Sequence, residues 1–429
     1  MIRRLLQVLL LVGLGVGAWL VRPGTIEPVR DRALEPQRPA FAGCFGAAER
    51  DVAALVSVGS IVRGDVIAQL VSPAGTAPVK EAVDGAGAAL VDFGDLGAAG
   101  TVGVLTEFPS ADAAAAVTMR RGDATAATAM CTPPLTGSAI AIGASTGTGE
   151  SAELVMTNPY AVDAVVAVES SSENGDDSAS ELASVLVPAR TTVTRDLDGL
   201  LPLRTSLSVR LRVERGAVHA GILQEAQGDV ASVEAVAPAQ DWWLPVLAVA
   251  NSGARLVIAT DSPLPVNVVV DSYRAGTVSE AVFEGVVEAR SQLDLDVGEV
   301  GELPMGIRVS SDGPVVVGLV VNGEQTRALS PATTLSTEWL LPGVGAFDGA
   351  RAWVFNAGEV SAELVLQPLA SGLAARAVEV PARAAVSVPM ETGGAGMLIR
   401  SSSEVAVLWS TRNGGLALGK GHPVAVLTD

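Results

Sequence analysis

The sequence predicts an all-β protein built from tandem β-sandwich units, with a single hydrophobic helix at its N-terminus. Hydrophobic residues make up 49% of the 429 residues but aromatic residues only 3%. The core must therefore be built from Val, Leu, Ile and Ala, which suits small β-sandwiches. The 46 glycines and 24 prolines also interrupt most stretches that could form a helix.

A third observation is an internal repeat of about 95 residues. The phrase "VPAR" at Val187 returns as "VEAR" at Val287 and as "VPAR" at Val380, and "WWLP" at Trp242 returns as "WLLP" at Trp339. Between these landmarks lie short runs in which apolar and polar residues alternate, the pattern of a half-buried strand. The chain is therefore interpreted as about four copies of one unit.

The repeat predicts four sandwiches that follow one another as a rod. The alternation in "LSVRLRVERG" directs Leu207, Val209 and Leu211 to the core and Arg210 and Arg212 to water. A β-propeller of eight blades, each of about 50 residues, is the alternative. The expected segments are a signal anchor or signal peptide at 1–21, a tether rich in Pro and charge at 22–42, and units at 43–134, 135–240, 241–337 and 338–429.

The N-terminus has the features of an export signal. Arg3 and Arg4 precede an apolar run from Leu5 to Val21. Positive charge ahead of the run predicts a single-pass membrane protein with its N-terminus inside and its bulk outside the cytoplasm. Cleavage after Ala18 would instead give a secreted protein, and this alternative stays open.

The two cysteines, Cys44 and Cys131, predict a disulfide, because isolated cysteines in an exported protein tend to pair. A lipoprotein acylation site at "FAGC", ending in Cys44, is the alternative, although 22 residues separate it from the apolar run.

The net charge of −19, from 47 acidic and 28 basic residues, makes nucleic acid an improbable partner, because phosphate backbones need a basic face. An envelope protein or a cell-wall polysaccharide is the expected partner, and the oligomeric state stays open.

Few residues form a pattern linked to catalysis or metal binding. "GASTG" around Ser145 matches Gly-x-Ser-x-Gly, but its surroundings predict strand, loop and strand, whereas a nucleophile elbow needs a helix. His219 and His422 lie in different units, and Lys420 precedes Gly where a phosphate loop needs Ser or Thr. We expect no catalytic residue, cofactor or metal. The acidic stretch that includes Glu173, Asn174, Asp176 and Asp177 is interpreted as a solvated hairpin loop, with a calcium site as the alternative.

Six recurring side chains are candidates for unit junctions or for an interaction surface. The tryptophans would either seal the junctions or stack on sugars. The arginines would pair with carboxylates or cap carbonyl groups at a strand entrance, or contact a ligand in each unit. These residues are Trp242, Trp243, Trp339, Arg190, Arg290 and Arg383.

Two resemblances follow from these motifs. "VPARTTVTRDL" from Val187, with the strands around it, is similar to the single β-sandwich of the sensory rhodopsin transducer family over about 60 residues. The whole chain resembles an actinobacterial envelope family described only as a domain of unknown function. The resemblances imply an Ig-like or transducer-like sandwich and an envelope location, and they bring no catalytic residues.

Together these features favour a non-enzymatic, membrane-tethered scaffold outside the cytoplasm. A carbohydrate-binding module for wall polysaccharide is the alternative, and an envelope hydrolase is a third and weaker one.

Overall fold

The described part of the chain is almost entirely β-strand, which confirms the all-β class. The helices found there are short: η1 (Ser180–Leu182), α2 (Leu197–Leu200) and α3 (Val297–Val300). No helix in this part is long and apolar enough to cross a membrane. The chain divides into two compact units, 1–32 and 33–429; the expected signal segment and residues 22–39 of the expected tether lie outside the described residues. The computed structural model describes residues 40–48, 52–60, 64–72, 78–83, 87–92, 100–108, 113–121, 124–226, 229–246, 253–274, 276–300, 304–322, 327–331, 333–344, 349–369, 373–390, 396–411 and 417–423.

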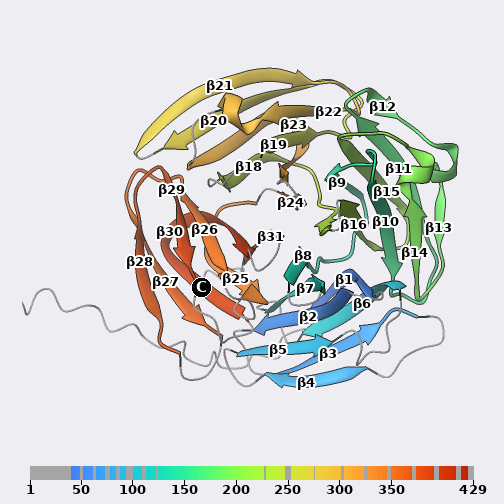
Figure 1. Ribbon diagram of the computed structural model, residues 1–429, viewed down its shortest axis with the longest axis horizontal. Helices are drawn as coiled ribbons and strands as arrows, with labels where there is room; N and C mark the ends of the chain where they lie inside the picture. Colours follow the sequence, from blue (N-terminus) through green and yellow to red (C-terminus); the bar gives the residue numbers. More distant parts are fainter. Residues whose placement is uncertain are drawn as a thin grey trace, which may run out of the picture. The chain divides into compact units, whose positions relative to one another are not determined.

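The strands fall into four groups, each of which forms a β-sandwich (Figure 1). In the first group the two sheets have the orders β1-β6-β3-β4 and β5-β2-β7-β8, and the second group repeats them as β9-β15-β11-β12 and β14-β10-β16-β17. The first sandwich comprises β1 (Ala40–Ala48), β2 (Val52–Ser60), β3 (Gly64–Leu70), β4 (Val79–Val83), β5 (Gly87–Asp92), β6 (Gly100–Phe108), β7 (Ala113–Arg121) and β8 (Ala124–Met130); the second comprises β9 (Ser138–Ala144), β10 (Glu150–Asn158), β11 (Ala164–Ser172), β12 (Gly175–Asp177), β13 (Val185–Val187), β14 (Thr191–Asp196), β15 (Leu207–Arg215), β16 (His219–Ala226) and β17 (Asp229–Glu234).

In the third and fourth sandwiches one long strand passes from the first sheet into the second. Residues 305–315 of β23 pair with β18 and β20, and residues 316–322 pair with β19 and β24. The second sandwich interrupts the same path at Gly216, whose φ of 78° lies in the left-handed region that favours glycine. The third sandwich comprises β18 (Ala239–Val246), β19 (Gly253–Ala259), β20 (Val266–Arg274), β21 (Thr277–Val287), β22 (Gln292–Asp296), β23 (Met305–Asn322) and β24 (Arg327–Pro331); the fourth comprises β25 (Ser336–Pro342), β26 (Arg351–Asn356), β27 (Ala362–Pro368), β28 (Arg376–Val380), β29 (Ala384–Pro389), β30 (Gly396–Thr411), β31 (Ala417–Lys420) and β32 (His422–Pro423).

The strand order shows that the β-propeller alternative is wrong. A propeller blade is a four-stranded sheet built from one short stretch of chain. Here each sheet takes its strands from the whole length of a sandwich: β1, β3, β4 and β6 form one sheet, while β2, β5, β7 and β8 form the other. Among the described strands, no stretch of about 50 residues supplies all the strands of one sheet.

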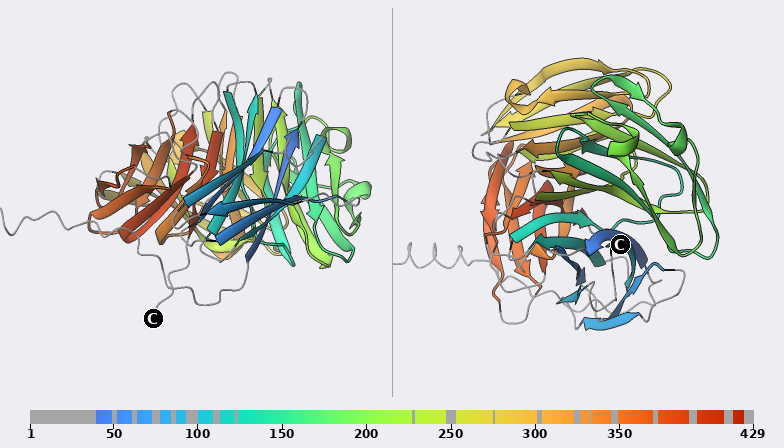
Figure 2. Two further views of the ribbon diagram at one scale, coloured as in Figure 1. Left: turned by 90° about the horizontal axis from the view of Figure 1, so that it is seen from below. Right: turned by 45° about the vertical axis from the view of Figure 1, so that its right-hand side comes forward.

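The sandwiches close into a ring within residues 33–429, so the expected rod is wrong. The last strands of the four sandwiches contact one another in a cycle, β8 with β17, β17 with β24, β24 with β31 and β31 with β8. Strands β2 and β7 of the first sandwich also pack on β25 of the fourth. Figure 2 shows the sheets of neighbouring sandwiches lying side by side around this ring.

Burial at the junctions explains why the ring closes. One apolar core runs through the second and third sandwiches and reaches Phe355 and Leu408 of the fourth. The core of the first includes Val155 and Leu223 of the second. Covering an aliphatic side chain of this size contributes about 1.5–3 kcal/mol, so a separate sandwich would expose faces that the ring buries.

The same packing corrects one detail of the predicted strand β15. Leu207 and Leu211 are buried as expected, and the side chain of Arg212 is 66% exposed. Arg210, however, is only 3% exposed, because its face of the sheet packs on the third sandwich.

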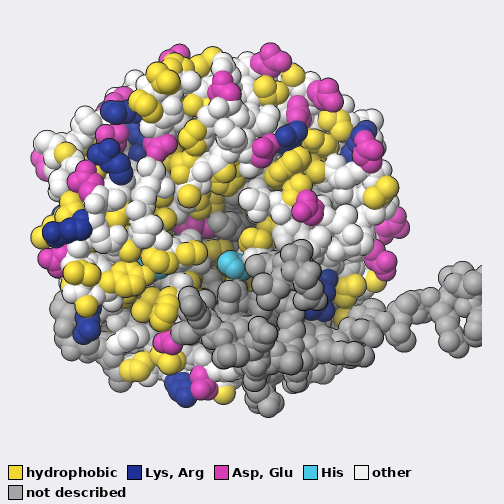
Figure 3. Space-filling view, turned by 180° about the vertical axis from the view of Figure 1, so that it is seen from behind, with side chains coloured by type: hydrophobic (Ala, Val, Ile, Leu, Met, Phe, Trp, Pro, Cys, Tyr) yellow, Lys and Arg dark blue, Asp and Glu magenta, His cyan; other side chains and the backbone are white. Residues whose placement is uncertain are grey.

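Charged side chains on the surface are mixed in sign. On the face drawn in Figure 3, acidic and basic side chains alternate around the rim with apolar patches between them. No basic patch is seen among the described residues of that face.

Candidate functional site at the sandwich junctions

The three recurring arginines occupy the same backbone position. Each follows the end of an edge strand and has φ in the left-handed region: 55° for Arg190, 54° for Arg290 and 52° for Arg383. Around Arg290 the Ser291 N–H donates to the Glu288 carbonyl, which closes a four-residue turn with the arginine third. A positive φ at that position is the pattern of a type II turn, in which glycine is the favoured residue.

Each of these turns bonds to the loop that precedes the third strand of its sandwich. The backbone N–H of Arg190 donates to the carbonyl of Tyr160 at 3.1 Å, that of Arg290 to Ser262 at 2.9 Å and that of Arg383 to Gly358 at 3.1 Å. The arginine turns and the loops therefore form one rigid end of each of these sandwiches.

The loops themselves are closed by the residue at the strand break. Asn158 donates from Nδ2 to the carbonyls of Val162 at 2.8 Å and Val187 at 3.0 Å, and Asn356 repeats this with Val360 and Val380. In the third sandwich the hydroxyl of Thr260 accepts from the Ser262 N–H at 3.1 Å. Both asparagines are fully buried, so they are structural residues.

The arginine turns also lie against the preceding sandwich. The carbonyl of Arg290 accepts a hydrogen bond from the buried guanidinium of Arg210, and the carbonyl of Arg383 accepts from the Gly276 N–H at 3.4 Å. Two open clefts mark the first two junctions. A cleft of about 230 Å³ is lined by Arg190 with Gln69, Leu70, Val71, Ser72, Leu105 and Pro159; one of about 260 Å³ is lined by Arg290 with Ser138, Ala167, Glu169, Arg210, Leu211, Arg212, Asp261 and Pro263.

Arg210 is the central side chain of the second cleft. Its guanidinium bonds to Asp176 at 2.5 Å and to the carbonyl of Ser170 at 3.2 Å, and lies 3.6 Å from Glu169. A buried charge is tolerated only when it is paired and hydrogen-bonded in this way. Arg212 and Arg290 add two further positive charges at the rim of the same cleft.

The three candidate tryptophans lie in different environments: two are buried in sandwich cores and one lies at a junction. Trp339 is fully buried in the core of the fourth sandwich and donates from Nε1 to the carbonyls of Ser336 and Val405, both at 3.1 Å. Trp242 is 5% exposed and makes the equivalent bonds to Ala239 and Val315. Neither indole offers the open ring face on which a sugar would stack.

Trp243 is the tryptophan at a junction. Its ring lies 6.0 Å from that of Phe355 in the fourth sandwich and 6.1 Å from that of Tyr273, and the Arg308 guanidinium lies 5.1 Å from its centroid. Its faces are therefore occupied by neighbours within the protein.

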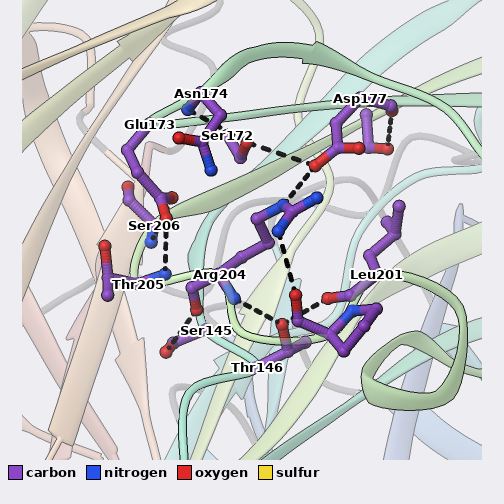
Figure 4. Close-up of polar contacts among 12 residues, drawn as sticks. Ser145, Thr146, Ser172, Glu173, Asn174, Asp177, Leu201, Arg204, Thr205 and Ser206 are labelled. Carbon is purple, nitrogen blue, oxygen red and sulfur yellow. Dashed lines mark hydrogen bonds and ion pairs between the residues drawn. The ribbon is translucent and has the colours of Figure 1, made fainter.

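Ser145 and the acidic loop belong to one polar network at the other end of the second sandwich (Figure 4). The hydroxyl of Ser145 donates to Glu150 and to the carbonyl of Arg204, and the residue is 1% exposed. Glu173 accepts the N–H groups of Thr205 and Ser206, both at 3.2 Å. Ser145 is therefore enclosed within the second sandwich and hydrogen-bonded there.

The remaining carboxylates of the acidic loop are paired with arginines. Arg204 bonds to Asp177, and this contact holds the pKa of Asp177 below its usual range. Asp176 pairs with Arg210. In the described part of the chain no group of three or more His, Cys, Asp or Glu could hold a metal ion. Both aspartates therefore have their charge balanced by an arginine of the same sandwich.

Both cysteines and one of the two histidines, His219, are buried where the first two sandwiches meet. Cys44 and Cys131 form the predicted disulfide, which rules out acylation of Cys44. His219 is 1% exposed, and its ring stacks on that of Tyr160 at 6.4 Å. His422 lies in β32 of the fourth sandwich, and Lys420 ends β31.

The fold and the junctions define a class: an all-β protein in which four sandwiches share buried faces and close on themselves. The chain belongs to the family of unknown function DUF5719, which it matches over residues 106–391. The match begins in β6 of the first sandwich and ends just after β29 of the fourth, so the family is defined by several sandwiches together. No curated protein matches the chain.

Proposed function

We propose that this protein is a non-enzymatic, membrane-tethered scaffold on the outer side of the cytoplasmic membrane, which presents a rigid surface to another component of the envelope. The proposal rests mainly on one observation: the polar side chains that the sequence offered as candidates form hydrogen bonds and ion pairs within the protein itself. Ser145, Glu173, Asp177 and Arg210 all serve contacts within or between sandwiches.

The location rests on three features that agree. The N-terminal apolar run after Arg3 and Arg4 is typical of an exported chain. The disulfide between Cys44 and Cys131 suits an oxidising compartment, and closing a loop of this length stabilises the fold by about 4–5 kcal/mol in the chain-entropy model. The net charge of −19 suits a soluble exterior.

The surface best suited to a partner is the cleft between the second and third sandwiches. It joins Arg212 and Arg290 to the carboxylates of Glu169 and Asp261, so it offers both signs of charge on a rigid base. Such a surface favours a polar protein partner, because complementary charges set the orientation of docking.

In situ crosslinking of cells that make the protein, followed by capture of the full chain, tests the proposal. Deleting sandwiches would open the ring, so point variants are the better comparison. We expect one envelope protein to be captured repeatedly, and Arg212→Glu to reduce its recovery while the exposed control Arg351→Glu does not. Equal recovery with both variants, or capture of wall polysaccharide alone, would contradict the proposal.

A further inference from the structure

The clefts at the first two junctions are equivalent in position but differ in chemistry. Each lies between an arginine turn and the preceding sandwich, with Arg190 in the first cleft and Arg290 in the second. Each also contains the residue just before the one whose carbonyl accepts from the arginine N–H, which is Pro159 in the first cleft and Asp261 in the second. The two clefts can therefore be compared position by position.

The wall that the preceding sandwich contributes is a cross-strand pair at the same register in both clefts. Gln69 of β3 pairs with Leu105 of β6, and Glu169 of β11 pairs with Arg210 of β15. Strands β3 and β11 are the equivalent third strands of their sandwiches, and Gln69 and Glu169 are both the sixth residue of the strand. The second cleft thus has a carboxylate and a guanidinium where the first has an amide and an aliphatic side chain.

Packing of the junction does not require these charges. The first junction forms with neutral side chains at all three positions. Burial of a guanidinium costs desolvation free energy that burial of a leucine does not, and Arg210 is only 3% exposed. Charges at three neighbouring positions of one cleft therefore suit the recognition of a charged ligand.

Two charges of the second cleft are available to such a ligand. Among the described residues, no hydrogen bond or ion pair engages the side chain of Arg290 or that of Asp261, and the two do not pair with each other. At the third junction the equivalent Arg383 is instead paired with Glu359 at 2.6 Å. The second cleft therefore offers one uncommitted positive charge and one uncommitted negative charge.

The backbone holds these two charges beside each other. The N–H of Arg290 donates to the carbonyl of Ser262, the residue after Asp261, at 2.9 Å. The hydroxyl of Thr260 accepts from the Ser262 N–H at 3.1 Å and donates to the carbonyl of Pro314 at 2.8 Å. Because the turn and the loop are already fixed, a ligand that bridges the two charges orders little of the protein when it binds.

We propose that the cleft between the second and third sandwiches binds a small zwitterion of amino-acid or dipeptide size, whose carboxylate meets Arg290 and whose ammonium group meets Asp261. Glu169, with a side chain 47% exposed, supplies a second carboxylate for the ammonium group. The cleft volume of about 260 Å³ suits this size, because it equals about nine water molecules at roughly 30 Å³ each. The inference goes beyond the proposed function, since this binding requires no protein partner.

A series of ω-amino acids tests the inference on the full chain purified in detergent. Glycine, β-alanine, 4-aminobutanoate and 6-aminohexanoate carry the same two charges at increasing separation, and saturation-transfer NMR detects weak binding of each. We expect one length to bind best, with a dissociation constant of about 0.1–1 mM. The N-acetyl and methyl ester forms of that compound, which each lack one charge, should bind about tenfold more weakly.

Point variants assign the binding to the cleft. Arg290→Gln and Asp261→Asn should each weaken binding of the best compound about tenfold, because each removes one of the two charges. Arg190→Gln is the matched control at the equivalent position of the neutral cleft and should leave binding unchanged. Thermal unfolding checks that each variant is folded, and Asp261→Asn decides the outcome independently if Arg290→Gln disturbs the turn.

Three results would overturn the inference. Equal binding of the singly charged forms would show attraction to charge without recognition of a zwitterion. Equal weakening by Arg190→Gln and Arg290→Gln would show that binding is not confined to the second cleft. The absence of binding by every compound of the series would exclude the zwitterion, and the crosslinking experiment on the protein partner would still stand as a separate test of the proposed function.

Discussion

Gly43 and His219 fit together so closely that only glycine can stand at position 43. A Cβ atom built on Gly43 would lie 2.0 Å from Cγ of His219. Gly43 belongs to β1 of the first sandwich and His219 to β16 of the second, beside the disulfide of Cys44. The junction between these sandwiches is therefore specified to the size of a single methyl group.

We expect Gly43→Ala to lower the free energy of unfolding by about 2–3 kcal/mol, because the added methyl group would overlap the imidazole of His219, which is only 1% exposed. Urea unfolding of the full chain measures the loss. Gly137→Ala is the control, since a Cβ there would meet nothing within 4 Å. The double variant Gly43→Ala/His219→Ala should lose less than the sum of the single changes, and strict additivity would contradict the contact.

The stability of the protein should fall in acid because of His219. Burial lowers the pKa of this imidazole from 6.5 to about 4, opposed by a contact with the backbone of Thr132 that does not reach hydrogen-bond geometry. Between pH 6.5 and about 4 the unfolded chain binds a proton that the folded chain excludes, so stability decreases as the pH falls, by roughly 1.4 kcal/mol per pH unit.

Replacement of the imidazole should remove that slope. We expect His219→Phe to flatten the pH dependence of the unfolding midpoint between pH 7 and 4.5, and the control Gly137→Ala, whose added Cβ would meet nothing within 4 Å, to leave it unchanged. A slope that persists in His219→Phe would assign the acid sensitivity to carboxylates.

Asn356 should be one of the most important polar residues of the fourth sandwich. It is fully buried, donates to the carbonyls of Val360 and Val380, and accepts the Gly358 N–H at 2.9 Å. Asn356→Ala leaves these groups without partners, so we expect a loss of about 2–3 kcal/mol in chemical unfolding. Asn267→Ala, which removes an exposed asparagine bonded to Asp312, should cost less than about 1 kcal/mol. Similar losses in the two variants would count against the loop-closing role.

Because the three recurring arginines have a positive φ, we expect glycine to be tolerated at their positions. Arg290 has φ of 54°, a conformation that costs a residue with a Cβ roughly 1 kcal/mol or more. Arg290→Gly should therefore keep or slightly raise the thermal midpoint, whereas Arg290→Val should lower it. If Arg290→Gly is clearly less stable, the guanidinium itself stabilises the junction.

Much of the architecture could be predicted because it depends on local pattern. The alternation around Leu207 and Val209 gave the correct buried face, since side chains on a strand point to opposite sides in turn. Two cysteines allow one intramolecular pairing, and Cys44 and Cys131 adopt it. The position of Arg210 was not predictable, because its burial depends on a second sandwich about 80 residues away in the sequence.

The candidate site shows the same division. The recurring Arg190, Arg290 and Arg383 were visible as a repeated phrase, but no sequence signal shows that their backbones adopt a positive φ or which sandwich their carbonyls meet. The contact between Gly43 and His219 had no signal beyond a lone histidine and a glycine.

The sequence by itself determined the β class, the repeat of about 95 residues and the disulfide, because composition, alternation and residue counts act locally. Only the tertiary structure decided that the sandwiches form a ring, that Trp242 and Trp339 are enclosed, and that Arg210 is buried against the next sandwich. These outcomes depend on which apolar faces meet across long stretches of chain, and the free energy of that burial is settled by shape when the sheets pack.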